Sequence, residues 1–554
     1  MDDHNGRQYE TWEWTHAGPV PAASRVEIDL TGSFHRDGKT VAVKGFYAGA
    51  GEYRLRFLPE EAGEYTFEIT SKALGVRETG VLRAAPAAPG RHGPVRARGT
   101  ALYHADGTRF ASFGTTVYAL ANQSEALIDE TLETLGAAPF NKLRTCVFPK
   151  HYAYNANNPR FYPFEVSAGH APKDFPAEGL PVFPTRKGEP DGYWDTARPC
   201  FAFWDHLEDV LRRLDRMGIE ADLILFHNYD RWGFSNMSRE DNLRYLDYAI
   251  RRLAAFPNVW WSMANEYDLC FDKTEEDFKV FERFIAANDP FAHPLSNHNC
   301  FQMWDAGSEC ISHVSFQTKE LTRVSELMRR YGKPVLVDEC RYEGNIPEFW
   351  GNLSGQEMVR SFWRVASQGG YCTHGETFLP ESAQGQLATR TGEKDVVWWA
   401  RGGRLSGKSP ARIAFLRGVI EGLPGPLEPV GGALSDFAHM EDTELRETMA
   451  RLPAEMQSFL GSIARMDRLE RELFYAVEYT YEGHCGNEAF LTYLDDQCPA
   501  VYELNLPEEH LYRVEVLDTW EMTRQTVLQG AKGRVRIPLP GKPYMAVLAA
   551  AEKE

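Results

Sequence analysis

The chain has 554 residues, of which 43% are apolar and 25% are charged, and this composition excludes a wholly disordered protein. At about 150 residues per domain, the length predicts three to four domains. The 79 Asp and Glu residues outnumber the 60 Lys and Arg residues, which gives a formal charge of −19. Because nucleic acids and anionic membranes attract clustered cations, neither is expected as a partner. The 13 Trp residues suit a sugar-binding surface, although large hydrophobic cores account for them equally well.

Several features predict a cytoplasmic protein. The N-terminal stretch has neither the basic start nor the apolar centre of a signal peptide. No apolar run approaches the ~18 residues of a membrane-spanning helix. The nine cysteines show no CxxC or zinc-like spacing, so reduced thiols are expected and a structural disulfide is the less favoured alternative. The sequence leaves the oligomeric state open, a homo-oligomer included.

Residues 1–88 are predicted to form a β-sandwich. Apolar and polar residues alternate in Val26–Leu30, Tyr53–Phe57 and Tyr65–Ile69, and this two-residue period is typical of half-buried strands. Short strands at such spacing favour a small sandwich. Residues 84–96, rich in Pro, Gly and Ala, predict a linker.

From about residue 100, strand and helix patterns alternate. The predicted strands are Phe110–Leu120, Asn141–Phe148, Ala221–Phe226, Asn258–Met263, Pro294–Asn299, His313–Gln317, Pro334–Asp338 and Tyr371–Glu376. Mostly apolar strands alternating with helices indicate a parallel sheet covered by helices. Eight strands over residues 97–440 therefore predict an α/β fold, the (β/α)8 TIM barrel. An open doubly wound sheet is the alternative, but no glycine-rich phosphate turn follows the first strand.

The rest of the chain is predicted to contain a helical connector and a second β-sandwich. The connector covers residues 441–470. The C-terminal β domain covers residues 471–554, on the evidence of β-prone runs such as Ala489–Leu494 and Tyr512–Val516.

Active sites of such barrels lie at the carboxyl ends of the strands. Glu266 follows the fourth predicted strand and Glu339 follows the seventh, so the two side chains could face each other across the barrel mouth. Two facing glutamates are typical of glycoside hydrolases, in which one carboxyl group donates a proton and the other attacks the anomeric carbon. The structural alternative is a pair of ion-pairing residues on the barrel rim.

The segments WWSMANEYD and PVLVDEC resemble the catalytic strand ends of the retaining glycoside hydrolases of clan A. The resemblance implies that Glu266 is the acid/base, that Glu339 is the nucleophile, and that Asn265 contacts the sugar 2-hydroxyl. Arg144 in NKLRTCVFPK resembles the arginine that orients and ionises the nucleophile, with a structural salt bridge as the alternative.

A resemblance to one branch of that clan covers nearly the whole chain. The segments VEIDLTGSF and GFYAGAGEYRLRFLPEEAGEYTFEITS resemble an immunoglobulin-like domain of unknown function that this branch joins to an apiosidase-like barrel and a C-terminal β domain. The chain departs from the clan at strand six, where His313 or Gln317 is the candidate equivalent of a His or Tyr. It also departs at strand eight, where His374 and Glu376 stand instead of a Trp. The resemblance therefore does not imply which sugar is bound.

Polar and aromatic residues near the strand ends are predicted to bind substrate. The set is Arg144, Asn265, His227, Asn228, His298, His313, Glu376, Trp304 and Trp398. Each residue also has a purely structural interpretation: the polar residues could cap loops or support other carboxylates, and Trp is a common core residue.

No catalytic metal and no other cofactor is expected, because the histidines form neither an HxH pair nor an HExxH motif. The prediction is a retaining glycoside hydrolase that acts at the ends of small oligosaccharides or glycosides. The long insertion Lys150–Cys200 is expected to wall off one end of its pocket. A non-catalytic carbohydrate-binding barrel is the alternative.

Overall fold

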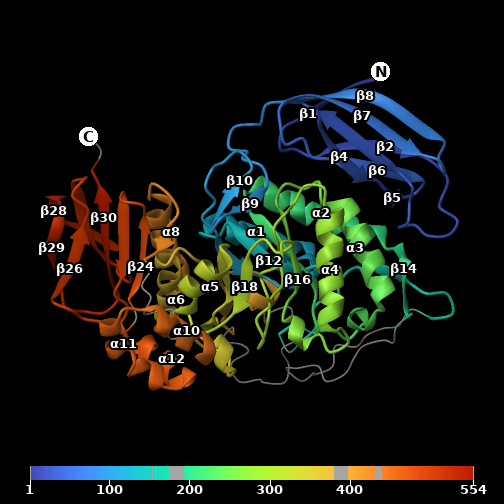
Figure 1. The fold of residues 1–554 in the computed structure, drawn as a ribbon. Helices are drawn as coiled ribbons and strands as arrows, with labels where there is room; N and C mark the ends of the chain where they lie inside the picture. The colour runs from blue at the N-terminus through green and yellow to red at the C-terminus, as the bar shows by residue number, and fades with distance from the viewer. Residues whose placement is uncertain are drawn as a thin grey trace.

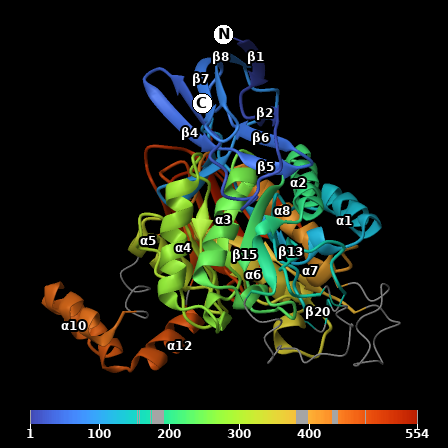
Figure 2. The ribbon, with the colours of Figure 1, turned by 90° about the vertical axis from the view of Figure 1, so that its right-hand side faces the viewer.

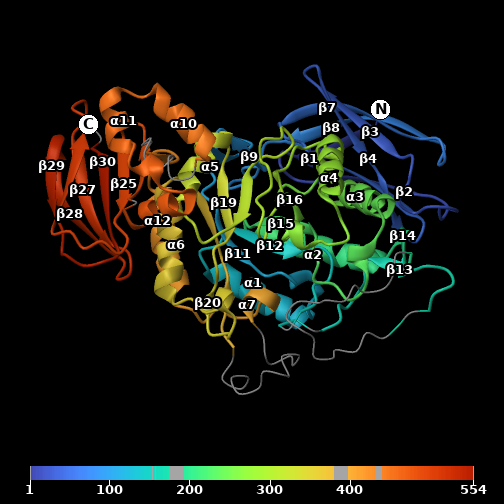
Figure 3. The same cartoon turned by 60° about the horizontal axis from the view of Figure 1, so that its bottom comes forward.

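The computed structural model describes residues 2–152, 154–155, 157–171, 173, 192–379, 397–430, 440–478 and 480–552. Figure 1 shows three regions: a central barrel with its helices, N-terminal strands on one flank and C-terminal strands on the other. Figure 3 shows the same arrangement from another direction. Among the described residues, no helix is long and apolar enough to cross a membrane.

The N-terminal region is a sandwich of two sheets. One sheet has the order β1 (Asp2–Arg7), β8 (Val76–Ala85), β7 (Gly63–Ser71), β3 (Thr31–Arg36) and β4 (Lys39–Lys44), and the other has the order β2 (Trp12–Ala17), β6 (Glu52–Phe57) and β5 (Phe46–Gly49). Phe34 of β3 stacks on Phe57 of β6, with ring centroids 3.9 Å apart. The two inner faces therefore share one aromatic core.

One predicted strand is not formed. Val26 and Leu30 are buried, as their alternation predicts, but residues 26–30 join no β-ladder. The N–H of Ile28 bonds to the carbonyl of Val26 at 2.9 Å instead. The alternating pattern indicates which residues are buried, and a packed loop can bury alternate residues as a strand does.

The central sheet has the order β17 (Leu295–Ser296), β16 (Val259–Ala264), β15 (Glu220–Phe226), β12 (Lys142–Cys146), β11 (Phe113–Thr116), β21 (Tyr371–His374), β19 (Val335–Glu339) and β18 (Val314–Gln317). Every pairing in it is parallel. Strands one and eight (β11 and β21) are neighbours, so the sheet curls into a ring. The ring nearly closes between β17 and β18, where the N–H of Ser312 donates to the carbonyl of Leu295 at 2.9 Å. The predicted TIM barrel is confirmed.

Seven helices of eight residues or more accompany these strands in the described part of the barrel: α1 (Glu125–Ala137), α2 (Phe201–Arg216), α3 (Arg239–Leu253), α4 (Glu275–Asn288), α5 (Arg323–Tyr331), α6 (Gly355–Ser367) and α8 (Ser409–Glu421). Local sequence fixes their starts. Ser238 caps α3 by accepting the N–H of Asp241, and Thr274 and Asp277 form a capping box at α4. Proline in the first turn of α8 fits a helix start.

The loops contain short helices and strands. They are β9 (Val95–Arg98), β10 (Ala101–His104), β13 (Phe164–Val166), β14 (Trp194–Pro199), β20 (Glu343–Gly344), β22 (Glu376–Thr377), α7 (Trp398–Arg401) and the 3-10 turns η1 (Leu120–Asn122), η2 (Phe234–Asn236), η3 (Tyr267–Leu269) and η4 (Phe349–Gly351). Strands β13 and β14 form a hairpin within the Lys150–Cys200 insertion. Much of that insertion lies outside the described residues.

The C-terminal region begins with α10 (Asp442–Arg451), α11 (Ala454–Leu460), η6 (Ile463–Arg465) and α12 (Arg468–Glu478). Figure 2 shows α10 standing away from the barrel. A six-stranded sheet follows in the order β23 (Glu428–Pro429), β24 (Tyr481–Cys485), β25 (Ala489–Tyr493), β30 (Met545–Ala551), β27 (Tyr512–Asp518) and β28 (Thr523–Ala531), beside the ribbon of β26 (Val501–Leu506) and β29 (Gly533–Pro538). Helix α12 thus occupies residues that the sequence predicts at the start of the β domain.

Ion pairs attach both flanking regions to the barrel. Arg56 of β6 makes a bidentate contact with Glu208 of α2, with both N–O distances at 2.8 Å. Arg360 of α6 contacts Asp495, which follows β25, at 2.7 Å. The flanking domains therefore pack against barrel helices.

Candidate active site

Glu266 and Glu339 stand at the carboxyl ends of two barrel strands, β16 and β19, that are separated in the ring by β17 and β18. Glu339 is the last residue of β19, and Glu266 follows β16 by two positions. Both side chains are largely buried, at 7% and 9% exposure. Glu266 adopts a φ of 55°, a left-handed conformation that costs about 1–3 kcal/mol for such a residue and persists only where its surroundings enforce it.

His298 enforces the turn at Glu266. The N–H of Glu266 donates to Nδ1 of His298 at 3.3 Å, and the N–H of Tyr267 donates to the His298 carbonyl at 2.8 Å. Because Nδ1 accepts, the imidazole proton resides on Nε2. That Nε2 is buried and has no protein partner among the described residues.

A hydrogen-bond relay connects the two carboxyl groups. Nδ2 of Asn265 donates to Oε2 of Glu266 at 3.0 Å. The Tyr118 hydroxyl lies 2.8 Å from Oδ1 of Asn265 and also hydrogen-bonds to Oε1 of Glu339. A hydroxyl has a single proton to donate, so Asn265 and Glu339 compete for it. The relay places both glutamates in one site.

Glu266 is poised to exchange a proton near neutral pH. Its carboxyl accepts a hydrogen bond from the Tyr229 hydroxyl and interacts with the Cys300 thiol. Burial raises the pKa of Glu266 to about 7, and the negative charge of Glu339 adds to the effect, while Lys150 and Tyr229 oppose it. A carboxyl group with such a pKa suits general acid catalysis.

Lys150 places a positive charge beside this pair. Its Nζ lies 3.4 Å from the ring centroid of Tyr118 and 4.2 Å from that of Tyr229, the two tyrosines that hydrogen-bond to Glu339 and Glu266. The residue is 2% exposed, and burial lowers its pKa. In the described part of the chain, no hydrogen bond or ion pair of its ammonium group is found. Its three N–H donors are therefore available to a ligand.

Aromatic side chains and unsatisfied polar atoms line the same site. Trp399 packs against Tyr152, with centroids 4.9 Å apart, and against Trp350, with centroids 4.7 Å apart. Nε1 of Trp399, the Tyr152 hydroxyl and Oε1 of Gln317 are buried without a hydrogen-bond partner among the described residues. Buried polar atoms normally have partners, so these atoms are ready to bind ligand hydroxyls.

A network of buried charges lies next to the pair. Nζ of Lys142 is 2.9 Å from Asp222 and 2.7 Å from Asp338, and Nη1 of Arg144 is 3.2 Å and 3.1 Å from the same two residues. Arg144 was expected to contact Glu339. Its ion pairs go instead to Asp338, one residue earlier, although the charge of Glu339 helps to raise its pKa.

Two predicted residues of strand three lie beside the site. His227 is buried, with Nε2 3.2 Å from the Phe148 carbonyl. Burial lowers its pKa to about 3, and the charge of Lys150 adds to this, so the imidazole is neutral. Asn228 is half-buried, and its carbonyl accepts the N–H of Asp230 at 2.9 Å.

The two predicted stacking residues serve the core instead. Nε1 of Trp304 donates to Glu282 at 3.0 Å, and Nε1 of Trp398 donates to Thr115 at 3.0 Å. Both rings are buried, at 6% and 2% exposure. Both indole N–H groups are therefore bonded to protein side chains.

His313 and Glu376 hydrogen-bond to protein groups other than the glutamates. His313 precedes β18 and hydrogen-bonds to Ser312 at 2.8 Å, at the strand's amino end, whereas Gln317 occupies the carboxyl end. The Glu376 carboxylate accepts the N–H groups of Ser406 and Gly407 at 2.5 Å and 2.8 Å. Each had been predicted to bind substrate from its nearness to a strand end, and each faces protein groups.

Sequence analysis missed Tyr118, Tyr229 and Lys150 as site residues. They follow the ends of β11, β15 and β12 by two to four positions. The sequence did contain a signal for these three residues. Each is a polar or aromatic residue that lies a few positions after the last residue of a barrel strand.

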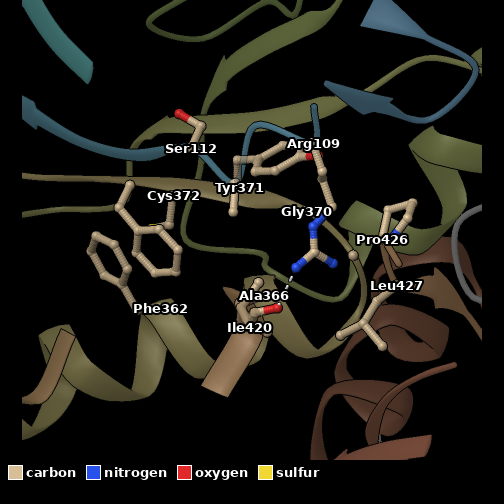
Figure 4. Close-up of a pocket in the computed structure, with 13 residues that line it drawn as sticks. Arg109, Ser112, Phe362, Ala366, Gly370, Tyr371, Cys372, Ile420, Pro426 and Leu427 are labelled. Atoms are coloured by element: carbon tan, nitrogen blue, oxygen red, sulfur yellow. Dashed lines mark hydrogen bonds between the residues drawn. The ribbon is translucent and has the colours of Figure 1, made fainter. Parts of the chain in front are cut away.

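A separate pocket lies at the other end of the barrel. Figure 4 shows Arg109, Tyr371 and Leu427 among the residues that line it. Nη2 of Arg109 donates to the Ile420 carbonyl at 2.7 Å. The pocket adjoins the amino ends of β11 and β21 and contains no carboxylate side chain, so it lacks the groups for acid–base chemistry.

The chain matches three family models. They are a domain of unknown function (DUF5060) over residues 6–72, an apiosidase-like catalytic domain over residues 97–379, and another domain of unknown function (DUF5605) over residues 478–549. The catalytic-domain model contains every strand of the barrel. None of the curated proteins compared with the chain matches it.

Solved structures agree with these matches. A crystal structure from Bacteroides vulgatus, provisionally described as a glycoside hydrolase, is 31% identical, with 99% of this chain and 100% of that chain covered and a TM-score of 0.80. A glycoside hydrolase family 5 protein from the same organism has 14% identity, covers 84% of this chain and 94% of its own, and has a TM-score of 0.56, which shows the fold alone. The chain therefore belongs to the family of apiosidase-like catalytic domains and is a glycoside hydrolase.

Proposed function

We propose that the enzyme is a retaining glycoside hydrolase in which Glu266 is the acid/base and Glu339 is the nucleophile. The hydrogen-bond relay from Glu266 through Asn265 and Tyr118 to Glu339 carries this proposal. It joins two buried carboxyl groups that differ in their surroundings, as a double displacement requires.

In the first step, protonated Glu266 gives its proton to the leaving oxygen while ionised Glu339 attacks the anomeric carbon. The glycosidic bond breaks and a glycosyl ester of Glu339 forms. In the second step, Glu266 takes a proton from water, which attacks the same carbon and releases Glu339. Retention requires carboxyl groups ~5–5.5 Å apart.

Other residues of the site bind and orient the sugar in this proposal. The Tyr118 hydroxyl holds Glu339 in place by a hydrogen bond. When Tyr118 donates its proton to Glu339, Oδ1 of Asn265 is free to accept a hydrogen bond from a ligand hydroxyl. Lys150 donates hydrogen bonds to sugar oxygens. Trp399 and Tyr152 offer an aromatic wall on which an apolar sugar face can pack.

We further propose cytoplasmic action at the ends of small oligosaccharides or glycosides. The nine cysteines, all of which the structure describes, form no disulfide, an arrangement that suits a reducing compartment. Polymers do not enter that compartment, so imported short substrates fit best.

A panel of aryl glycosides tests the catalytic proposal. The parent enzyme should hydrolyse at least one sugar, and Glu339→Ala should lose at least ~10³-fold in kcat. Added azide should restore turnover of Glu339→Ala and give a glycosyl azide of inverted configuration. Product NMR on the parent should show the substrate's own anomer first. An inverted first product would overturn the retaining mechanism, and failure of the parent to hydrolyse any sugar would favour a carbohydrate-binding barrel.

A further inference from the structure

Outside the proposed catalytic pair, Glu343, His374 and Glu376 form a buried cluster. One donor atom from each residue lies within 4.8 Å of the others. Their side chains come from β20, β21 and β22, and the residues are at most 1% exposed. Imidazole and carboxylate groups are the ligands that divalent transition metals take in proteins.

The start of α8 holds the two carboxylates in position. Glu343 accepts the N–H groups of Lys408 at 2.8 Å and Ser409 at 3.0 Å, and Glu376 accepts those of Ser406 and Gly407. A Cβ atom on Gly407 would lie 2.4 Å from Oε2 of Glu343 and 2.7 Å from Oε2 of Glu376. The two Oε2 atoms therefore converge on the same glycine, and each keeps a second lone pair for another partner.

The cluster has no positive charge of its own. In the part of the chain that the structure describes, no basic side chain forms an ion pair with Glu343 or Glu376. The four amides and the helix dipole supply partial charges only, whereas two buried carboxylates carry two full negative charges. Amide hydrogen bonds do not neutralise these charges, and buried charges are costly, so a cation or a proton would stabilise this pair.

His374 provides the second, independent indication. Its Nδ1 lies 3.1 Å from Oγ1 of Thr115, while its Nε2 is buried and has no hydrogen-bond partner in the described residues. With Nδ1–H donating to Thr115, Nε2 carries a free lone pair. A hydrogen bond on the far nitrogen is the usual way in which proteins orient a metal-binding histidine.

We propose that Glu343, His374 and Glu376 bind a divalent transition-metal ion, with Zn²⁺ as the best fit to one imidazole and two carboxylates. The ion neutralises the two carboxylates and gives Nε2 of His374 a partner. It joins β20, β21 and β22 to the start of α8, and its role is structural. The proposal does not depend on the assignment of Glu266 and Glu339.

The experiment uses the full-length protein without a polyhistidine tag. Elemental analysis should find about one zinc per chain. Removal of zinc with EDTA should lower the melting temperature, and ZnCl2 should restore it. A competition titration against a chromophoric chelator should show that Glu376→Gln weakens zinc binding by at least ~10-fold.

The matched control is Glu282→Gln, which changes another buried carboxylate, one that hydrogen-bonds to Trp304. It should leave zinc affinity unchanged. A parent protein that contains no zinc, and whose melting temperature responds neither to EDTA nor to Zn²⁺, Mn²⁺ or Co²⁺, would overturn the proposal. A proton shared by Glu343 and Glu376 would then neutralise the cluster. Because these readouts use the parent, they decide the matter even where Glu376→Gln fails to fold.

Discussion

The barrel holds two sets of buried carboxylates that are paired in opposite ways. In the charge network (Lys142, Arg144, Asp222 and Asp338), two cations face two anions at 2.7–3.2 Å. In the glutamate pair (Glu266 and Glu339), the partners are tyrosine hydroxyls and an amide. Asp338 and Glu339 are consecutive in sequence, yet they belong to different sets.

The difference in pairing decides which carboxylates can exchange protons. Burial alone would raise the pKa of Asp338, but the charges of Lys142 and Arg144 outweigh burial and lower it. Glu266 has no such ion pair, so burial and the charge of Glu339 raise its pKa to about 7. The two cations therefore keep Asp338 ionised, whereas the glutamate pair is suited to proton exchange at neutral pH.

The largest expected effect is on catalysis by Glu266→Gln. Because the amide cannot donate a proton as an acid, kcat should fall by about 10²–10⁴-fold for substrates with poor leaving groups. Aryl glycosides with activated leaving groups should lose much less, since they need little protonation. Steady-state kinetics over a series of leaving groups measures this dependence. An equal loss for all leaving groups would contradict the acid role, and Glu282→Gln serves as the control.

The next effect concerns the stability of the network. Lys142→Met removes one cation and leaves buried carboxylates underpaired, so unfolding free energy should fall by about 3–5 kcal/mol in urea titrations. The same titrations on Glu266→Gln should show no such loss. A Lys142→Met variant as stable as the parent would show that the charge network does not stabilise the fold.

Glu266 also predicts a pH dependence of stability. Its folded pKa of about 7 lies above its ordinary value of 4.5, so the folded state binds more protons than the unfolded state between these values. Stability should then decrease as pH rises from about 4.5 to about 7. Glu266→Gln should make this decrease smaller, while buried Glu220, whose pKa is also raised to about 8, keeps part of it, and urea titrations of both proteins at several pH values measure the difference. A decrease of equal size in the variant would contradict the assignment.

A smaller effect is expected from Lys150→Met. The loss of a charged hydrogen-bond donor should lower kcat/KM by about 10–100-fold. Because Lys150 lowers the pKa of Glu266, the variant's alkaline limb of kcat/KM should move to higher pH from its position near 7 in the parent. Lys44→Met, at an ion pair of the N-terminal sandwich with Asp247, is the control. A reduced rate with an unshifted limb would mean that Lys150 does not act on Glu266.

Periodicity predicted the barrel because its strands are buried on both faces. Every residue of β12, β15, β16 and β19 is buried, so apolar runs mark them. The pattern overestimated β17, predicted as Pro294–Asn299 and observed as Leu295–Ser296. Asn299 leaves the ladder and bridges to Gln317 through its side chain, which accepts the Gln317 N–H at 3.2 Å.

The candidate site was less predictable, because position at a strand end does not fix the direction of a side chain. Thr373 bonds to Asp338 inside the barrel at 2.8 Å, so His374, the next residue, faces outward by alternation, and Glu376 places a carboxylate oxygen near its imidazole. Tyr118 and Lys150 reach the site from loops, and hydrophobic periodicity does not predict the path of a loop.

The most direct test of the glutamate pair is to trap the covalent intermediate. An activated 2-deoxy-2-fluoro glycoside of the sugar that the enzyme cleaves should inactivate it, because fluorine slows both steps and the activated leaving group speeds only the first. Peptide mass spectrometry should then find one glycosyl group on Glu339, and none when Glu339→Ala is treated. A label on another residue, with Glu339 unmodified, would contradict the account.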